Sequence, residues 1–199
     1  MLKITEIYKE YKIMPNLQMH QLRVAAVAKM ICDSMDIELD KDKVLKATLL
    51  HDMGNVIKFD LVQTQKIFGY SDFETEEAKR VQKEFIDKYG DNEHEATVKI
   101  IKEIGLSEDI MNMADENRFS YMCKHKEIDD IYMKIMHYAD GRVGPHGILS
   151  YEDRMNDAGN RYKNHRINSW QEDERLKLVE CGREIEKQIF LVQILNQKI

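Results

Sequence analysis

Apolar residues recur at intervals of three and four along most of this 199-residue chain, and this spacing most constrains its fold. The spacing gathers apolar side chains on one face of an α-helix, whereas strict alternation, which would indicate a strand, is absent over a strand's length. Only two Pro and nine Gly interrupt the pattern, so few breaks separate the expected helices. The sequence therefore predicts an all-α fold.

The spacing of apolar and helix-breaking residues also predicts how the chain is organised. We expect helices over about residues 3–12, 16–31, 41–51, 75–88, 94–104, 108–117, 129–140, 151–162 and 172–195, with a loop around residues 70–73. The Gly- and Pro-containing stretch at residues 141–147 is the one plausible internal boundary. We predict a single domain over residues 1–199, with a core at about 15–145 and a C-terminal helical extension at about 148–199.

Composition limits the partners and the compartment. Thirty basic against 36 acidic residues give a net charge of −6, which argues against binding to a nucleic-acid polymer but allows a small phosphorylated ligand. The chain lacks the roughly 20 consecutive apolar residues that span a bilayer, so we expect no membrane contact and a cytoplasmic location. Cys32, Cys123 and Cys181 form no C-x-x-C pair, and we therefore expect neither a zinc knuckle nor a disulfide framework, in a reducing compartment.

The segment from Leu49 to Gly54 is the most informative for chemistry. His51 and Asp52 stand together at the end of a strongly apolar predicted helix. Burying two ionisable groups there is unfavourable unless they are paired or bind a metal ion. Neighbouring helical residues point about 100° apart, so these two side chains can reach only one edge of an ion and other helices must supply further ligands.

Two more residues qualify as ligands by their position on apolar helical faces. His20 shares a face with Leu17, Val24 and Val27. Asp140 ends a predicted helix and lies on the same side of that helix as the apolar residues Met133 and Met136. Two imidazoles and two carboxylates from three separate helices can therefore converge on one cation.

The order His20, His51-Asp52 and Asp140 within helices resembles the HD-domain metal-dependent phosphohydrolase superfamily. Residues 20–25 (HQLRVA), 47–54 (ATLLHDMG) and 138–142 (YADGR) carry the resemblance. It implies an all-α, HD-domain-like helical bundle in which these four residues hold a divalent cation, Mn, Fe, Co, Ni or Mg. It also implies that water activated by the metal hydrolyses a small phosphorylated substrate, with a nucleotide as the expected compound.

The sequence departs from that family's pattern after the His-Asp pair. Several subfamilies place a lysine or a glutamate where Asn55 stands here, and the nearest lysine is Lys58. His94 matches the first of two further histidines that a dinuclear site would use, but no histidine occurs near residues 116–117. We expect Asp52 both to bind the metal and to orient the attacking water. Because Asn55 cannot donate a proton, His94 and Lys58 are the candidates for protonating the leaving group. A non-catalytic sensor that binds metal or nucleotide is the alternative, and a di-iron oxygenase is a more distant one.

The remaining candidates have a structural interpretation beside a functional one. Arg23 and Arg142, like Lys58, can contact substrate phosphate or be ordinary surface cations. His137 can support Asp140, although we expect it to be partly exposed. Three histidines, His125, His146 and His165, are expected at the surface.

The last helix carries an apolar stripe that can pack on its own core or form a homodimer contact. The stripe consists of Leu176, Val179, Ile185, Ile189, Val192 and Leu195.

Overall fold

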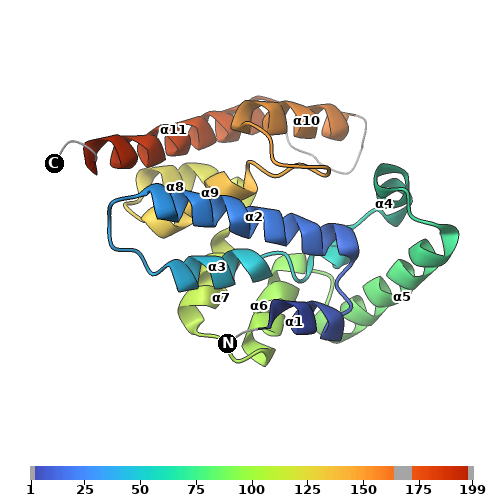
Figure 1. Cartoon of the computed structure of the whole chain (residues 1–199). Helices are drawn as coiled ribbons and strands as arrows, with labels where there is room; N and C mark the ends of the chain where they lie inside the picture. Colours follow the sequence, from blue (N-terminus) through green and yellow to red (C-terminus); the bar gives the residue numbers. More distant parts are fainter. Residues whose placement is uncertain (1–2, 164–171, 197–199) are drawn as a thin grey trace. The chain divides into compact units, whose positions relative to one another are not determined.

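The computed structural model describes residues 3–163 and 172–196, and these form eleven α-helices and no strand (Figure 1). The prediction of an all-α fold is confirmed. The chain divides into two compact units: the first unit comprises residues 1–22 and 46–115, and the second unit comprises residues 23–45 and 116–199. None of the described helices is both long and apolar enough to cross a membrane. The single-domain organisation stays a prediction.

The first unit contains two helices that pack against a 3-10 turn. Its elements are α1 (Ile4–Glu10), the start of α2 (Pro15–Ser34), the end of α3 (Lys41–Leu50), η1 (Asn55–Lys58), α4 (Leu61–Phe68), α5 (Asp72–Tyr89), α6 (Glu93–Glu103) and most of α7 (Glu108–Glu116). Helices α5 and α6 both pack against η1 and against each other, and α4 packs on α5. The segment that follows the His-Asp pair is therefore enclosed by helices.

Local capping decides where two of these helices begin. The expected helix at residues 75–88 starts earlier, at Asp72, because Ser71 and Glu74 form a reciprocal capping box. Helix α4 was not predicted, although the Asp60 carboxylate accepts hydrogen bonds from two backbone N–H groups at its start. Gly69 ends α4 with φ of 70°, a conformation that glycine adopts without strain. At eight residues, α4 is too short for periodicity to reveal it.

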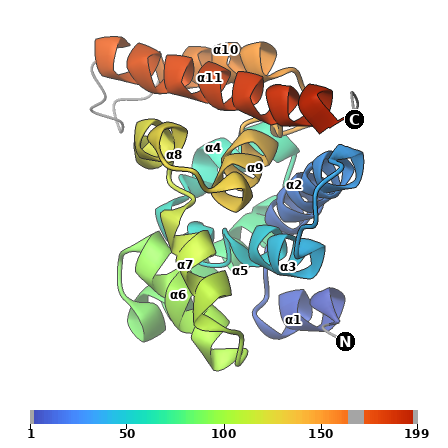
Figure 2. The same ribbon diagram turned by 90° about the vertical axis from the view of Figure 1, so that its left-hand side faces the viewer.

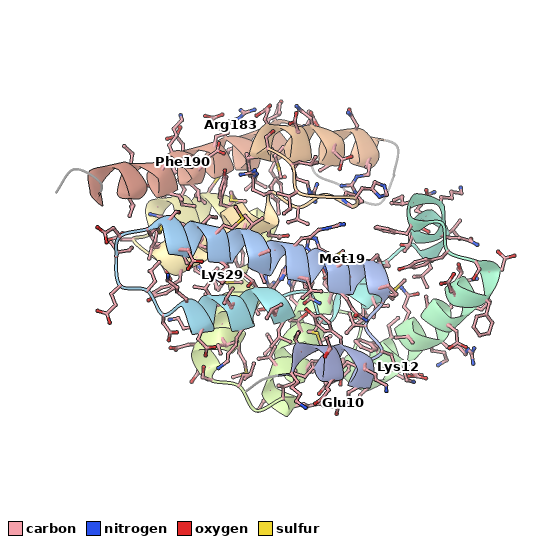
Figure 3. All side chains as sticks on the ribbon, viewed as in Figure 1. Glu10, Lys12, Met19, Lys29, Arg183 and Phe190 are labelled. Atoms are coloured by element: carbon pink, nitrogen blue, oxygen red, sulfur yellow. A yellow bond between two sulfur atoms is a disulfide. The ribbon has the colours of Figure 1, made fainter. Side chains whose placement is uncertain are left out.

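The second unit contains η2 (Phe119–Tyr121), α8 (Met122–Glu127), α9 (Ile131–Asp140), α10 (Tyr151–Lys163) and α11 (Glu172–Asn196), together with the remaining parts of α2 and α3. The long helix α11 packs along α8 and α9 (Figure 2). Val179, Ile185 and Ile189 of its apolar stripe are buried, whereas Leu176 of the stripe is 48% exposed. Phe190, which lies on α11 outside the stripe (Figure 3), is also exposed. The stripe therefore packs largely on its own unit. The Leu195 side chain lies outside the described residues, and the homodimer contact stays a prediction.

A disulfide joins Cys123 of α8 to Cys181 of α11. The expectation that the cysteines form no disulfide is therefore wrong. The two cysteines are 58 positions apart, a separation that gives no local motif, and the packing of α11 on α8 brings their Cα atoms within 5.0 Å. Cys32 is buried and free, and the cytoplasmic location stays a prediction.

Two histidines of the second unit are buried, which corrects the expectations that His125 lies at the surface and that His137 is partly exposed. His125 is 2% exposed and His137 is 3% exposed, and their ring centroids are 4.8 Å apart. His125 lies on α8, whose short polar sequence MCKHKE resembles a loop, and its Nε2 is 3.0 Å from Glu116 Oε2. Its Nδ1 is buried without a hydrogen-bond partner. His146 is exposed, as expected, and His165 lies outside the described residues.

We expect the disulfide to stabilise the oxidised protein. Closing a loop of this length lowers the entropy of the unfolded chain and contributes roughly 4 kcal/mol in the chain-entropy model. Urea unfolding of the Cys123→Ser/Cys181→Ser variant should therefore show a lower free energy of unfolding than the oxidised wild type. Reduced wild-type protein is the control and should match the variant. A count of three free thiols in denatured, air-oxidised protein, rather than one, would contradict the bond.

Burial of His125 predicts a loss of stability in mild acid. Desolvation lowers the pKa of His125 below its ordinary value of 6.5, and the opposing attraction of Glu116 does not restore it. The unfolded chain therefore takes up this proton at a higher pH than the folded chain, so the free energy of unfolding falls as pH drops below about 6.5. Urea unfolding from pH 7.5 to 5.5 should give a shallower pH dependence for His125→Gln. An unchanged slope would exclude His125 as a source of the effect.

Candidate metal centre

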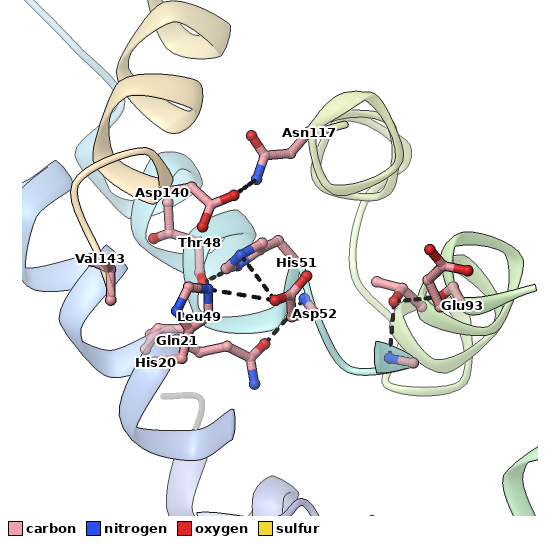
Figure 4. A network of polar contacts seen from close by, with 12 residues as sticks. His20, Gln21, Thr48, Leu49, His51, Asp52, Glu93, Asn117, Asp140 and Val143 are labelled. Carbon is pink, nitrogen blue, oxygen red and sulfur yellow. Dashed lines mark hydrogen bonds and ion pairs between the residues drawn. The ribbon is translucent and has the colours of Figure 1, made fainter. Parts of the chain in front are cut away.

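Three of the four predicted ligands lie together in the first unit. His20 Nε2 is 3.4 Å from Asp52 Oδ2, and His51 Nε2 is 3.6 Å from the same oxygen (Figure 4). One ligand atom from each of the three residues lies within 4.8 Å of the other two. His20 comes from α2, whereas His51 and Asp52 directly follow α3. The packing of two helices thus forms a cluster of two nitrogens and one oxygen.

The His51 ring is oriented by the backbone of its own helix. Its Nδ1 is 2.8 Å from the carbonyl oxygen of Thr48, and a carbonyl oxygen only accepts hydrogen bonds. Nδ1 therefore carries the proton and donates it, which leaves the lone pair on Nε2 beside Asp52. Metal-binding histidines are commonly held in this way. The His51 side chain is 1% exposed, so the surrounding protein fixes this arrangement.

The backbone that carries the pair is held from two neighbouring helices. Gln21, which is fully buried on α2, accepts a hydrogen bond at Oε1 from the backbone N–H of Asp52 (3.2 Å). Tyr8 of α1 donates to the carbonyl of Leu49 (2.6 Å), and burial, followed by the nearby Asp52 carboxylate, raises the pKa of Tyr8. Neither Tyr8 nor Gln21 was predicted to support the site. Gln21 had a signal, because it lies four residues after Leu17 and three before Val24 on the buried face of α2.

Close contact with α6 explains why a glycine stands at position 54, two residues after Asp52. A Cβ atom placed on Gly54 would lie 2.2 Å from the backbone oxygen of Glu93, well inside the range that real contacts allow. The Gly54 N–H donates to Thr97 Oγ1 at 2.9 Å, so the chain touches the first turns of α6. Any side chain at this position would push the His-Asp segment away from α6.

The donor set fits a divalent transition metal. Two neutral imidazole nitrogens and one carboxylate oxygen, without thiolate, suit Mn²⁺, Fe²⁺, Co²⁺ or Ni²⁺ and admit Mg²⁺ less readily. His20 and Asp52 keep about one fifth of their side chains exposed, so solvent and a ligand can reach the cluster. The side chains thus match the requirements of a metal site with open positions.

Asp140, the fourth predicted ligand, ends α9 in the second unit. Its Oδ2 accepts a hydrogen bond from Asn117 Nδ2 at 3.3 Å (Figure 4). Asn117 stands where a dinuclear site would have a second additional histidine, and it contacts Asp140 instead. The role of Asp140 as a ligand stays a prediction.

Lys58 and His94, the candidate proton donors, meet at a residue that the sequence did not indicate. Lys58 Nζ is 3.3 Å and His94 Nε2 is 3.5 Å from Glu93 Oε1. Burial raises the pKa of Glu93, but attraction to Lys58 and His94 outweighs this effect and leaves that pKa below its ordinary value. The carboxylate is therefore ionised at neutral pH and lies within ion-pair distance of both side chains. Their catalytic roles stay predictions.

Comparison with known protein families identifies a domain in this chain. The family model of the HD domain matches residues 18–142, which is more than half of the chain. This range includes all four predicted ligands. No curated protein and no solved structure matches the chain.

The geometry predicts that Asp52→Asn weakens metal binding. The change removes the negative charge of the oxygen that lies next to both imidazoles and keeps the size of the side chain. Replacing a residue that only hydrogen-bonds to a metal ligand lowers metal affinity by about 10- to 100-fold. Because Asp52 is itself a predicted ligand, we expect at least a tenfold rise in the Kd for Mn²⁺, measured by calorimetry. Asp87→Asn is the matched control, because Asp87 is exposed and pairs with Lys83 on the surface of α5. Equal Mn²⁺ affinity in both variants would contradict the site.

Proposed function

The chain belongs to the HD-domain superfamily of metal-dependent phosphohydrolases, and on this premise we propose that it hydrolyses a small phosphorylated compound, with a nucleotide as the expected substrate. The observation that carries the proposal is the cluster of His20, His51 and Asp52, with the proton of His51 held on Nδ1 by the Thr48 carbonyl. The net charge of −6 favours a small ligand over a nucleic-acid polymer.

Each residue of the cluster has a distinct task in this proposal. A divalent cation held there would polarise a phosphoryl oxygen and lower the pKa of water. His20 and His51 contribute neutral nitrogens, and Asp52 contributes a negative oxygen that also orients the attacking water. Gln21 holds the Asp52 backbone, so the carboxylate does not have to reorganise when substrate binds. Asp140, fixed by Asn117, is proposed as the fourth ligand.

Protonation of the leaving group is assigned to the first unit as well. Lys58 and His94 both lie beside the Glu93 carboxylate. Either side chain can donate a proton to a departing oxygen, whereas the neutral amide of Asn55 cannot. We therefore propose that one of these two residues replaces the acid that related subfamilies place at position 55.

A sensor that binds metal without turnover is the second candidate. The observation that favours it is Asn55, a neutral residue that is 7% exposed and stands where several subfamilies place a lysine or a glutamate. Such a protein would keep the ligand cluster and bind a phosphorylated compound without cleaving it.

Metal analysis combined with a phosphate-release screen over nucleotides and sugar phosphates separates these candidates. We expect bound metal and release of phosphate, with activity reduced at least about 100-fold in Asp52→Asn and unchanged in Asp87→Asn. Circular dichroism should show the same helical signal for both variants. Bound metal without release from any compound would favour the sensor, and full activity in Asp52→Asn would refute the site. Two irons per chain would instead indicate the oxygenase.

A further inference from the structure

The segment that follows α9 forms a tight hairpin in the second unit. Val143 pairs with Ile148 in an isolated β-bridge, and the Gly144 N–H donates to the Gly147 carbonyl at 2.8 Å. The Leu149 N–H donates to the Arg142 carbonyl at 2.7 Å and closes the base of the hairpin. Residues 141–149 are therefore ordered by their own backbone hydrogen bonds.

Three arginines donate to carbonyl oxygens of this hairpin, and we call them the arginine cluster. Arg23 Nη1 is 3.3 Å from the Pro145 oxygen, and Arg154 Nε is 2.7 Å from the Val143 oxygen. Arg142 Nε donates to the Leu149 oxygen within the hairpin itself. All three side chains are partly buried, and they come from α2, α10 and the hairpin.

The arginine cluster carries positive charge without a paired carboxylate among residues 3–163 and 172–196. None of its three members forms an ion pair with a carboxylate in the described part of the chain. Other arginines of the second unit do: Arg161 pairs with Asp157, Arg175 with Glu172 and Arg183 with Glu152. A neutral side chain would serve equally well as a donor to a carbonyl, so a purely structural role does not explain three charges at one hairpin.

Unused hydrogen-bond donors accompany the charge. Arg154 Nη1 is buried and has no acceptor, which is unfavourable for a charged group. Arg142 is held in place by Tyr138, because its Nη1 donates to the Tyr138 oxygen at 2.8 Å while that hydroxyl donates to Glu186 at 2.6 Å. Each guanidinium has five N–H groups, and one or two of them donate hydrogen bonds to residues that the structure describes.

We propose that the arginine cluster binds a phosphate group. The planar N–H pairs of guanidinium match the spacing of phosphate oxygens, and a dianion would compensate the charge that the protein leaves unpaired. A carboxylate ligand could compensate only one charge. The site involves residues of the second unit alone and does not depend on the proposed hydrolysis.

Binding of inorganic phosphate to metal-free, full-length protein tests the proposal. Removing metal with a chelator keeps the His20 cluster from contributing phosphate affinity. We expect saturable binding by calorimetry at physiological chloride concentration, with a Kd raised at least tenfold in Arg154→Gln and in Arg23→Gln. The matched control is Arg183→Gln, which removes the same charge from the same unit at an arginine already paired with Glu152 and Glu180, and its Kd should stay within twofold.

The outcomes are decisive in both directions. Absence of saturable phosphate binding to the wild type, or equal loss in Arg183→Gln, would overturn the proposal, the latter by showing a general charge effect. Should Arg154→Gln fail to fold by circular dichroism, Arg154→Lys keeps the charge without the planar fork and should still weaken binding. Failure of hydrolysis would leave this binding intact, so the two proposals fail separately.

Kinetics then show the source of the phosphate once a substrate is found. Competitive inhibition by inorganic phosphate that disappears in Arg154→Gln, with KM raised and kcat retained, would support a phosphate carried by the substrate. Inhibition or activation that is not competitive and disappears in the same variant would support a free phosphate ion. An effect of phosphate that persists unchanged in Arg154→Gln would count against the arginine cluster.

Discussion

The hydrogen bond from His51 Nδ1 to the Thr48 carbonyl is the interaction on which the candidate site depends. It selects the nitrogen that faces Asp52, and the His51 side chain that makes it is buried at the end of α3. Polar contacts from α1 and α2 hold the same stretch of backbone, through Tyr8 and Gln21. A site assembled this way keeps its shape without a ligand, because a buried hydrogen bond is hard to replace with water.

Helical periodicity was sufficient to predict the fold class and to single out His20, His51 and Asp52. Their faces are set by the regular 3.6-residue repeat, which the sequence displays directly. Glu93 could not be predicted, because its closeness to Lys58 depends on how α6 packs on η1. Asn117 likewise gains meaning only from its contact with Asp140. Residues that support a site from another element leave no periodic trace.

The errors in the second unit share one physical cause. Helix α8 has six residues, too few to be stable alone, and its polar sequence indicates a loop. Packing of α11 on α8 buries His125 and brings Cys123 to Cys181. A contact between segments 58 positions apart therefore decides the environment of residues whose own neighbours suggest exposure to solvent.

The bond between Cys123 and Cys181 turns the intervening chain into a covalent ring. Asp140, Arg142 and Arg154 all belong to that ring. A single peptide-bond cleavage anywhere inside it would leave one molecule, with both fragments still joined through sulfur until a reductant is added. The hairpin and the end of α9 would thus stay linked to the rest of the protein after a nick that would release them from an open chain.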